Sequence, residues 1–280
     1  MKIGFFDSGI GGMTVLYHAL RLLPKEDYIY YADTQHVPYG EKSKADVKKY
    51  VFEAVDFLVR QGIKALVIAC NTATSIAAKE LREKYDFPII GIEPAVKPAI
   101  LRSQEKGRRV LVFTTSLTLR EEKFNNLVAR LDEDHIVDGL ALPGLVEFAE
   151  RFEFSEAVVR PYLTAQLAPY KLEEYGTVVL GCTHFPFYKD TMQTIFAPEV
   201  DIIDGGKGTA ENLARTLQKS NKFQQGTGSV DYYMSGNKVQ DPRLLQQYAR
   251  LLERLHILDN LQPPTSQRVC QEQSLHYLSP

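Results

Sequence analysis

Short apolar runs alternate with longer amphipathic stretches along most of the chain. The runs that predict strands cover residues 2–6, 28–32, 65–69, 89–90, 109–113, 177–180 and 200–203. Apolar residues at helical spacing predict helices over residues 13–23, 44–61, 74–85, 121–131, 209–219 and 241–258. Apolar strands that are each followed by turn residues and a helix are typical of parallel sheets flanked by helices. The pattern therefore predicts an α/β fold with mainly parallel sheets.

Two of the predicted strand ends resemble each other. Residues 65–72 read Ala-Leu-Val-Ile-Ala-Cys-Asn-Thr, and residues 178–184 read Val-Val-Leu-Gly-Cys-Thr-His. This similarity indicates two related halves, and open α/β sheets bind ligands at the carboxyl ends of their strands. We therefore predict two similar doubly wound domains with the active site in the cleft between them.

The length of 280 residues also favours two domains. We expect residues 1–95 plus 206–258 to form the first domain, residues 96–205 the second, and residues 259–280 a C-terminal tail. The polar segment 218–228 is predicted to be a surface loop.

Composition narrows the class of protein. The chain is 44% hydrophobic and 24% charged, as expected for a globular protein. Its 33 basic and 35 acidic residues give a net charge of -2 without a long block of like charge, so we expect no nucleic-acid partner and favour a small molecule. No apolar run is long enough for a signal peptide or a membrane span, which predicts a cytoplasmic protein with no membrane partner.

The three cysteines are too few for a disulfide framework and are expected to be reduced thiols. Cys70 and Cys182 each follow a predicted strand, where a helix start or a neighbouring histidine lowers the pKa of a thiol. A single cysteine at such a place often packs merely as a small buried side chain, but a matched pair favours chemistry. Cys270 lies in the polar tail, and we predict no role for it.

Residues 6–12, Phe-Asp-Ser-Gly-Ile-Gly-Gly, lie between a predicted strand and a predicted helix. Glycines allow a ligand to approach the backbone, and a helix start offers free N–H groups to a carboxylate or phosphate. The segment fits equally well a tight turn in which Asp7 or Ser8 caps the helix, and its glycine spacing is not that of a dinucleotide-binding loop. Residues 205–209, Gly-Gly-Lys-Gly-Thr, lack the adjacent Gly-Lys-Thr of a phosphate-binding loop and are predicted to be a helix-entry turn.

Besides acid/base chemistry, cysteines and histidines can bind a metal ion or form a Cys/His hydrolase site. No Cys-x-x-Cys or His-x-x-x-His spacing occurs, so no metal site is predicted. Cys182 and His184 would also suit a Cys/His hydrolase, but that hypothesis leaves Cys70 unexplained.

Taken together, the motifs resemble the glutamate racemase family within the aspartate/glutamate racemase superfamily, from residue 2 to about residue 217. The resemblance also rests on Tyr-Ala-Asp-Thr at residues 31–34, Val-Pro-Tyr-Gly at 37–40, Thr115 and Thr118, and Leu-Val-Glu at 145–147. The chain departs from the family's pattern at Thr114, where the family usually has glycine, and at Glu121, where it usually has serine. Residues 140–144 also lack the family's Cys-Pro.

The resemblance implies the roles of individual residues. Cys70 and Cys182 are expected to be catalytic, assisted by Asp7 and His184 respectively, with Glu147 near His184. The expected substrate-binding residues are Asp7, Ser8, Pro38, Tyr39, Gly40, Asn71, Thr72, Thr115, Thr118, Thr183 and His184. Without the resemblance, Tyr39 and Gly40 would be taken as a turn. The two threonines would be strand-end caps and Glu147 a solvated helix residue.

Inverting an α-carbon requires one base to remove a proton from one face and one acid to deliver a proton to the other. The resemblance implies that Cys70 deprotonates D-glutamate and Cys182 deprotonates L-glutamate, that no cofactor takes part, and that the protein is a homodimer. It also implies a role in supplying D-glutamate for peptidoglycan synthesis, and hence in cell wall biogenesis and cell shape. Racemisation of aspartate on the same residues and a non-catalytic binding protein with the same fold remain alternatives.

Overall fold

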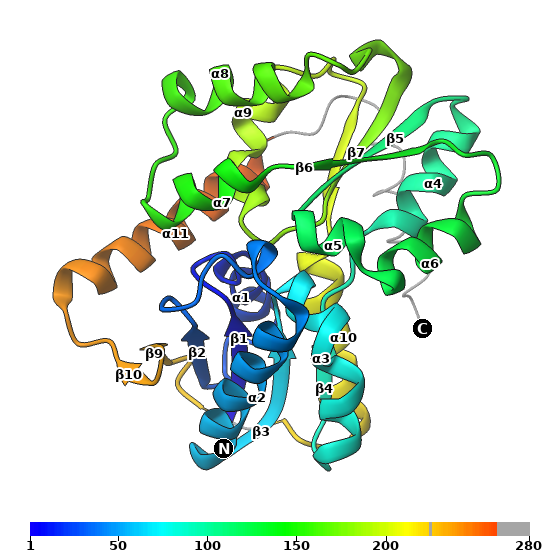
Figure 1. Ribbon diagram of the computed structural model, residues 1–280. Helices are drawn as coiled ribbons and strands as arrows, with labels where there is room; N and C mark the ends of the chain where they lie inside the picture. The colour runs from blue at the N-terminus through cyan, green and yellow to red at the C-terminus, as the bar shows by residue number, and fades with distance from the viewer. Residues whose placement is uncertain (224–225, 262–280) are drawn as a thin grey trace, which may run out of the picture.

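Two β-sheets organise the computed structural model, which describes residues 1–223 and 226–261 (Figure 1). The first sheet contains β1 (Lys2–Asp7), β2 (Tyr28–Ala32), β3 (Ile63–Ile68), β4 (Ile89–Gly91), β9 (Val230–Met234) and β10 (Asn237–Lys238). Its strand order is β10-β9-β2-β1-β3-β4, and every pair is parallel except β9 with β10.

The second sheet is wholly parallel. It contains β5 (Arg109–Thr114), β6 (Val137–Ala141), β7 (Tyr175–Leu180) and β8 (Asp201–Asp204), in the order β6-β5-β7-β8. The predicted fold class, α/β with mainly parallel sheets, is confirmed.

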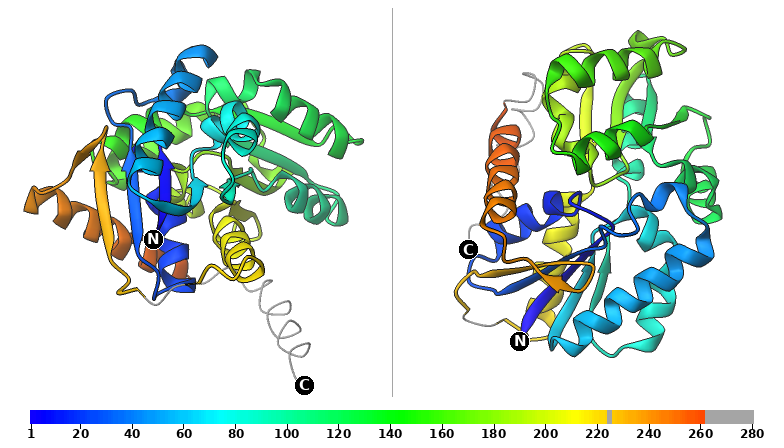
Figure 2. Two further views of the ribbon diagram at one scale, coloured as in Figure 1. Left: turned by 90° about the horizontal axis from the view of Figure 1, so that it is seen from below. Right: turned by 60° about the vertical axis from the view of Figure 1, so that its left-hand side comes forward.

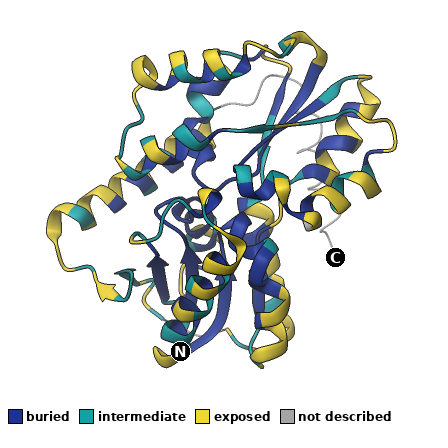
Figure 3. Ribbon diagram, in the orientation of Figure 1, coloured by how far each residue is buried: buried dark blue, intermediate teal, exposed yellow. Residues whose placement is uncertain are grey.

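Burial explains why the central strands form where they do. Every residue of β3 and of β7 is buried, because helices cover both faces of a parallel sheet. Figure 3 shows the central strands in the buried colour and the outward faces of the helices exposed. The carboxyl ends of β1, β3 and β7 carry the conspicuous sequence motifs.

Helices pack against each sheet. Around the first are α1 (Met13–Leu22), α2 (Lys44–Arg60), α3 (Asn71–Lys84) and α10 (Gly206–Lys219). Around the second are α4 (Val96–Glu105), α5 (Ser116–Arg120), α6 (Glu122–Leu131), α7 (Pro143–Glu150), α8 (Glu156–Leu167) and α9 (Lys189–Gln193). Short 3₁₀ turns are η1 (Tyr39–Glu41), η2 (Leu172–Glu174) and η3 (Phe185–Tyr188).

The last described helix, α11 (Pro242–Asn260), joins the two halves. It packs on α1 beside the first sheet and on η3 beside the second, and Figures 1 and 2 show it running from one half towards the other. Arg254 donates hydrogen bonds to the carbonyl oxygen of Phe187, at 2.8 Å and 3.0 Å, and pairs with Asp190. The helix thus holds η3 from outside.

The chain passes between the sheets twice. It leaves the first sheet after β4, enters the second through α4, and returns from β8 into α10. These two crossings touch, because a Cβ atom on Gly205 would overlap the carbonyl oxygen of Glu93. The second sheet is therefore inserted into the first half at a single place.

Some elements and segments differ from the sequence predictions. Helix α3 begins at Asn71, directly after Cys70, and α10 begins at Gly206, each three residues earlier than expected. The predicted loop 218–228 starts late in α10, which runs to Lys219; its described remainder forms no helix or strand. The predictions for Cys270 and for the tail beyond residue 261 lie outside the described residues. Within residues 1–223 and 226–261, no helix is long and apolar enough to cross a membrane.

Candidate active site

The two cysteines lie just beyond the carboxyl ends of parallel strands. Cys70 follows β3 and Cys182 follows β7, and both are interior strands, β3 between β1 and β4 and β7 between β5 and β8. Backbone hydrogen bonds carry each strand one residue further, from the Ala69 amide to Phe6 at 2.8 Å and from the Gly181 amide to Phe113 at 2.7 Å. Each cysteine is thus the first residue beyond this extended strand pairing.

Both cysteines line one small cavity. It measures about 20 Å³, room for about one water molecule. Its lining is Ser8, Pro38, Tyr39, Gly40, Cys70, Asn71, Thr72, Thr115, Val146, Gly181, Cys182, Thr183 and His184. Both sulfur-bearing side chains are buried, with 6% and 7% of the residue exposed. Eleven of these lining residues were predicted from the sequence; Asp7, Thr118 and Glu147 are not part of the lining.

Cys70 is the N-cap of α3. Its sulfur accepts a hydrogen bond from the Ala73 amide at 3.4 Å and donates to the Ser8 hydroxyl at 3.9 Å. Burial raises the pKa of the Cys70 thiol, and the nearby Asp7 carboxylate raises it further, whereas the Ala73 amide acts in the opposite direction. In this arrangement Cys70 is a protonated thiol, ready to donate.

Asp7 of the first half contacts Thr183 of the second. It is fully buried, one carboxylate oxygen accepts from the Gly9 amide at 3.0 Å, and the other accepts from the Thr183 hydroxyl at 3.1 Å. Burial raises the pKa of Asp7 to about 6, although the charge on His184 acts to lower it. The carboxyl group therefore titrates near neutral pH, in the range useful for an acid/base helper.

Cys182 begins a chain of three side chains. His184 Nδ1 lies 3.7 Å from the Cys182 sulfur, and His184 Nε2 lies 2.6 Å from Glu150 Oε1. Burial opposes protonation of His184, but the hydrogen bonds to Cys182 and Glu150 outweigh it and raise the pKa of His184 well above its ordinary value. The imidazole is therefore held as a cation between an acidic partner and the thiol.

Glu147 is not beside His184, so the prediction that placed it there is wrong. Its side chain is 56% exposed and lies 3.8 Å from the Arg151 guanidinium. Glu150, the last residue of α7, takes the expected position and also accepts the Ile10 amide at 2.8 Å. Val146 in the middle of α7 lines the cavity, the final side chain of the helix meets His184, and Glu147 turns to solvent.

Three threonine hydroxyls join the halves on the other side. Thr72 in α3 lies 3.1 Å from Thr115 and 3.1 Å from Thr118, which are themselves 3.0 Å apart. Thr118 thus belongs to this cluster although it is absent from the cavity lining. Beside it, a Cβ atom on Gly40 would lie 2.6 Å from the Cβ of Thr115, so the η1 backbone packs directly on α5.

Asn71 has a polar side chain in the cavity lining that makes no hydrogen bond within the described part of the chain. Only 6% of it is exposed, and among the described residues neither its side-chain oxygen nor its nitrogen has a hydrogen-bond partner. A buried amide in this state costs free energy unless a ligand or water satisfies it. The arrangement is that of a site built to hold a polar molecule.

Asp33 is a neighbour of the site that the sequence prediction did not include. It is buried at the end of β2 and accepts hydrogen bonds from Tyr39 at 2.6 Å and Ser235 at 3.1 Å, with His36 Nδ1 at 2.9 Å. It anchors the loop that brings Tyr39 to the cavity. Its position directly after an apolar strand was the available signal, the same one that singled out Asp7.

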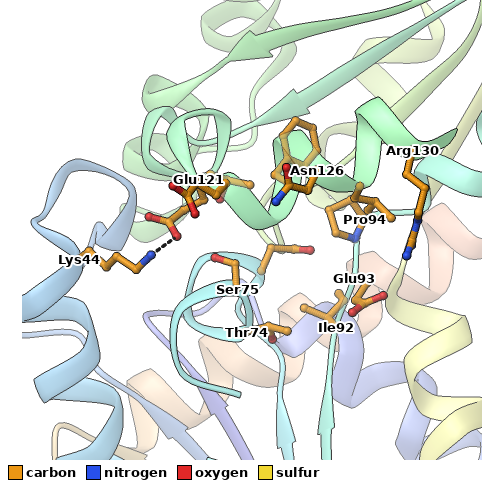
Figure 4. Close-up of a pocket in the computed structure, with 14 residues that line it drawn as sticks. Lys44, Thr74, Ser75, Ile92, Glu93, Pro94, Glu121, Asn126 and Arg130 are labelled. Atoms are coloured by element: carbon orange, nitrogen blue, oxygen red, sulfur yellow. Dashed lines mark hydrogen bonds and ion pairs between the residues drawn. The ribbon is translucent and has the colours of Figure 1, made fainter. Parts of the chain in front are cut away.

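A larger cavity of about 600 Å³ adjoins the small one and shares Asn71 with it. Figure 4 shows Lys44 reaching from the first half to Glu121 of the second, at 2.8 Å. Glu121 is one of the residues that depart from the family's pattern, and 7% of it is exposed. Neither cysteine lines this cavity, so it is not the candidate catalytic centre.

No group of three or more His, Cys, Asp or Glu side chains suited to a metal ion occurs in residues 1–223 and 226–261.

Comparisons with known proteins point in one direction. The family model described as Asp/Glu/Hydantoin racemase matches residues 15–213. Glutamate racemase 2 of Bacillus subtilis is 58% identical over 262 residues, which cover 94% of this chain and 98% of the relative. The crystal structure of Escherichia coli glutamate racemase with L-glutamate and the activator UDP-MurNAc-ala superposes with a TM-score of 0.77 at 31% identity, covering 91% of this chain and 95% of that one. The Francisella tularensis glutamate racemase with D-glutamate gives a TM-score of 0.76 at 26% identity, covering 90% and 93%.

Proposed function

Because the chain belongs to the glutamate racemases of the Asp/Glu/Hydantoin racemase family, we propose that Cys70 and Cys182 interconvert L-glutamate and D-glutamate as opposed acid/base groups. Enzymes of this family are cofactor-independent isomerases. The observation that carries the proposal is one small cavity lined by both thiols, each at the end of a strand in a different sheet.

In the direction from L to D, the Cys182 thiolate takes the α-proton, and the electron pair of the broken C–H bond spreads into the α-carboxylate. The Cys70 thiol then delivers its proton to the opposite face, which gives D-glutamate, a thiol at Cys182 and a thiolate at Cys70. The reverse direction exchanges the two roles. His184 assists Cys182, whose sulfur lies 3.7 Å from His184 Nδ1. Asp7 assists Cys70, since burial raises the pKa of Asp7 to about 6, in the working range of such a helper.

Binding of the substrate follows from the donors around the cavity. Helix α3 begins at Asn71, so the first backbone amides of the helix and the unpartnered side chain of Asn71 suit the α-carboxylate. The negative charge of this carboxylate grows as the α-proton leaves. We assign the remaining lining, with Tyr39, Gly40 and Thr115, to the side-chain carboxylate. The distance between this part of the lining and the position of the α-carboxylate would determine whether glutamate or aspartate is accepted.

We also propose two domains, formed by residues 1–95 plus 206–258 and by residues 96–205. We propose further that the protein is a homodimer and is located in the cytoplasm. The division into two domains is supported by the two sheets and their two crossings. The supply of D-glutamate for peptidoglycan is proposed on the family alone.

The experiment is solvent deuterium incorporation at the α-carbon, followed by NMR with purified protein and no added cofactor. L- and D-glutamate should both acquire deuterium and reach a racemic mixture, while L- and D-aspartate should exchange at least about a hundredfold more slowly. Exchange of aspartate at the glutamate rate would assign a different substrate, and no exchange of either would overturn the proposed function.

A further inference from the structure

Tyr188 lies at the end of η3, four residues after His184. It is fully buried, and its hydroxyl is 3.2 Å from the carbonyl oxygen of Leu145 and 3.2 Å from that of Glu153. Burial raises the pKa of Tyr188, so the hydroxyl keeps its proton and acts as a donor. Leu145 lies in the first turn of α7 and Glu153 lies just beyond its end. One hydroxyl therefore ties the turn that follows His184 to both ends of the helix that carries Glu150.

The end of α7 has an unusual backbone. Phe152 has a φ of +57°, in the left-handed region that residues other than glycine rarely adopt. The Phe152 amide bonds to Ala149 at 2.8 Å and the Glu153 amide to Phe148 at 2.9 Å, which is the pattern of a Schellman helix end. A strained residue persists only where its surroundings hold it, and the Tyr188 hydroxyl on the Glu153 carbonyl is one such restraint.

The contacts of Glu150 depend on where the end of α7 lies. Its carboxylate oxygen Oε1 is 2.6 Å from His184 and 2.8 Å from the Ile10 amide. Glu150 is the last residue of α7, so any fraying of the helix end moves it first.

We propose that Tyr188 is a positioning residue for the Cys182 half of the reaction: its hydroxyl fixes the end of α7 so that Glu150 holds His184 against the thiol. The inference rests on the proposed function, since it presupposes that each cysteine serves one enantiomer. Nothing comparable links Tyr188 to Cys70, whose described polar contacts are with Ser8 and Ala73.

The test uses Tyr188→Phe, which removes one hydroxyl and keeps the ring. The matched control is Tyr28→Phe, because Tyr28 is also fully buried and its hydroxyl also lies near two carbonyl oxygens, those of Leu23 at 2.7 Å and Ala19 at 3.2 Å. Neither tyrosine lines the cavity, and both variants lose similar bonds. Only Tyr188 contacts the two ends of α7, the helix that carries Glu150, whereas Tyr28 contacts the end of α1. Circular dichroism and thermal melting establish that each variant is folded.

The assay separates the two cysteines. In L- or D-3-chloroglutamate, a thiolate removes the α-proton, the C–Cl bond breaks as the C=C bond forms, and chloride leaves. The resulting enamine becomes an imine, which water hydrolyses to 2-oxoglutarate and ammonia. This reaction needs one base only, so the L isomer reports on Cys182 and the D isomer on Cys70.

For Tyr188→Phe we expect kcat/KM for the L isomer to fall about tenfold and for the D isomer to stay within about twofold of wild type. Tyr28→Phe should leave both within about twofold. Glu150→Gln should reproduce the L-specific loss, and adding Tyr188→Phe to it should cause little further loss, because both changes act on the same contact.

Equal losses for the two isomers, or a Tyr188→Phe variant indistinguishable from Tyr28→Phe, would overturn the inference and assign Tyr188 to stability alone. The proposed function fails in a different way, through wild-type protein that neither racemises glutamate nor eliminates chloride.

Discussion

Each of the two proposed catalytic thiols has its own set of neighbours. Cys70 is next to Ser8 and a helix start, with the fully buried Asp7 close by, while Cys182 is next to His184 and, through it, Glu150. One side is therefore neutral or acidic and the other carries a histidine cation. Two chemically different bases serving two mirror-image substrates should respond differently to the same substitution.

Replacing Cys70 or Cys182 by serine tests this. A serine hydroxyl is far too weak an acid to form a base near neutral pH, so racemisation should fall more than about a hundredfold in both variants. Elimination should survive unequally, on the L isomer of 3-chloroglutamate in Cys70→Ser and on the D isomer in Cys182→Ser. Stability should change by less than about 1 kcal/mol, because the volumes are nearly equal and serine is itself a good N-cap at position 70. Loss of the same isomer in both variants would rule out one base per face.

Asp7 makes a separate prediction about pH. Its pKa rises from 3.8 to about 6 on folding, so the folded state favours the protonated acid, and this contribution to stability is lost as pH rises from about 4 to 6. Asp7→Asn removes the ionisation. Relative to wild type, the variant should gain on the order of 2 to 3 kcal/mol between pH 4 and pH 7 while losing activity. Urea unfolding at several pH values measures the difference, and a difference independent of pH would contradict the assignment.

At the level of single residues, the motifs located most of the site but missed the second layer around it. Asp7, both cysteines and His184 lie within two residues of the end of a predicted apolar strand or of a cysteine, so they are visible in the sequence. Glu150 has no such signal, because its place depends on where α7 ends and on which end lies against His184. That end is set by a left-handed Phe152, and nothing in the local sequence announces a non-glycine residue in that conformation.

The helices and strands show the same division. Buried strands with continuous apolar runs, such as β1, β3 and β7, were predicted within two residues of their ends. Strands β6 and β9 were missed because they are only partly buried: β6 is an edge strand with Asp138 and Gly139 in it, and β9 carries Asp231. Helix α3 was expected to start at Thr74 because the polar residues Asn71 and Thr72 look like a loop; in the structure they form its first turn, facing the cavity.

At the scale of the whole molecule, the site exists only when the two halves meet. Gly40 of the first half packs on Thr115 of the second, and the threonine cluster and the Lys44–Glu121 ion pair lie along the same boundary. A cavity of about 20 Å³ is too small to admit a whole glutamate without movement of its walls. Close packing of the halves and access for the substrate are therefore opposing demands on this boundary.

Gly40→Ala tests the need for close packing. The new methyl group would lie 2.6 Å from the Cβ of Thr115, so the halves must separate by roughly an ångström, and a displacement of that size costs about a hundredfold in rate. Racemisation should fall by ten- to a hundredfold, while thermal stability changes little because each sheet keeps its own core. Gly208→Ala is the matched control, since a Cβ atom there meets nothing within 4 Å. Normal activity of Gly40→Ala would show that the halves need not close this far.

The burial of both sulfurs has a consequence for what the enzyme is between turnovers. In the proposed mechanism, conversion of L to D leaves Cys182 protonated and Cys70 deprotonated, so the molecule that releases D-glutamate is prepared for D-glutamate and not for L. Both cysteines are buried, and Glu150, whose side chain is 17% exposed, is connected to Cys182 through His184. In this mechanism the protein alternates between two forms, each selective for one enantiomer. The form left after turnover persists until a proton has returned from Cys182 to Cys70.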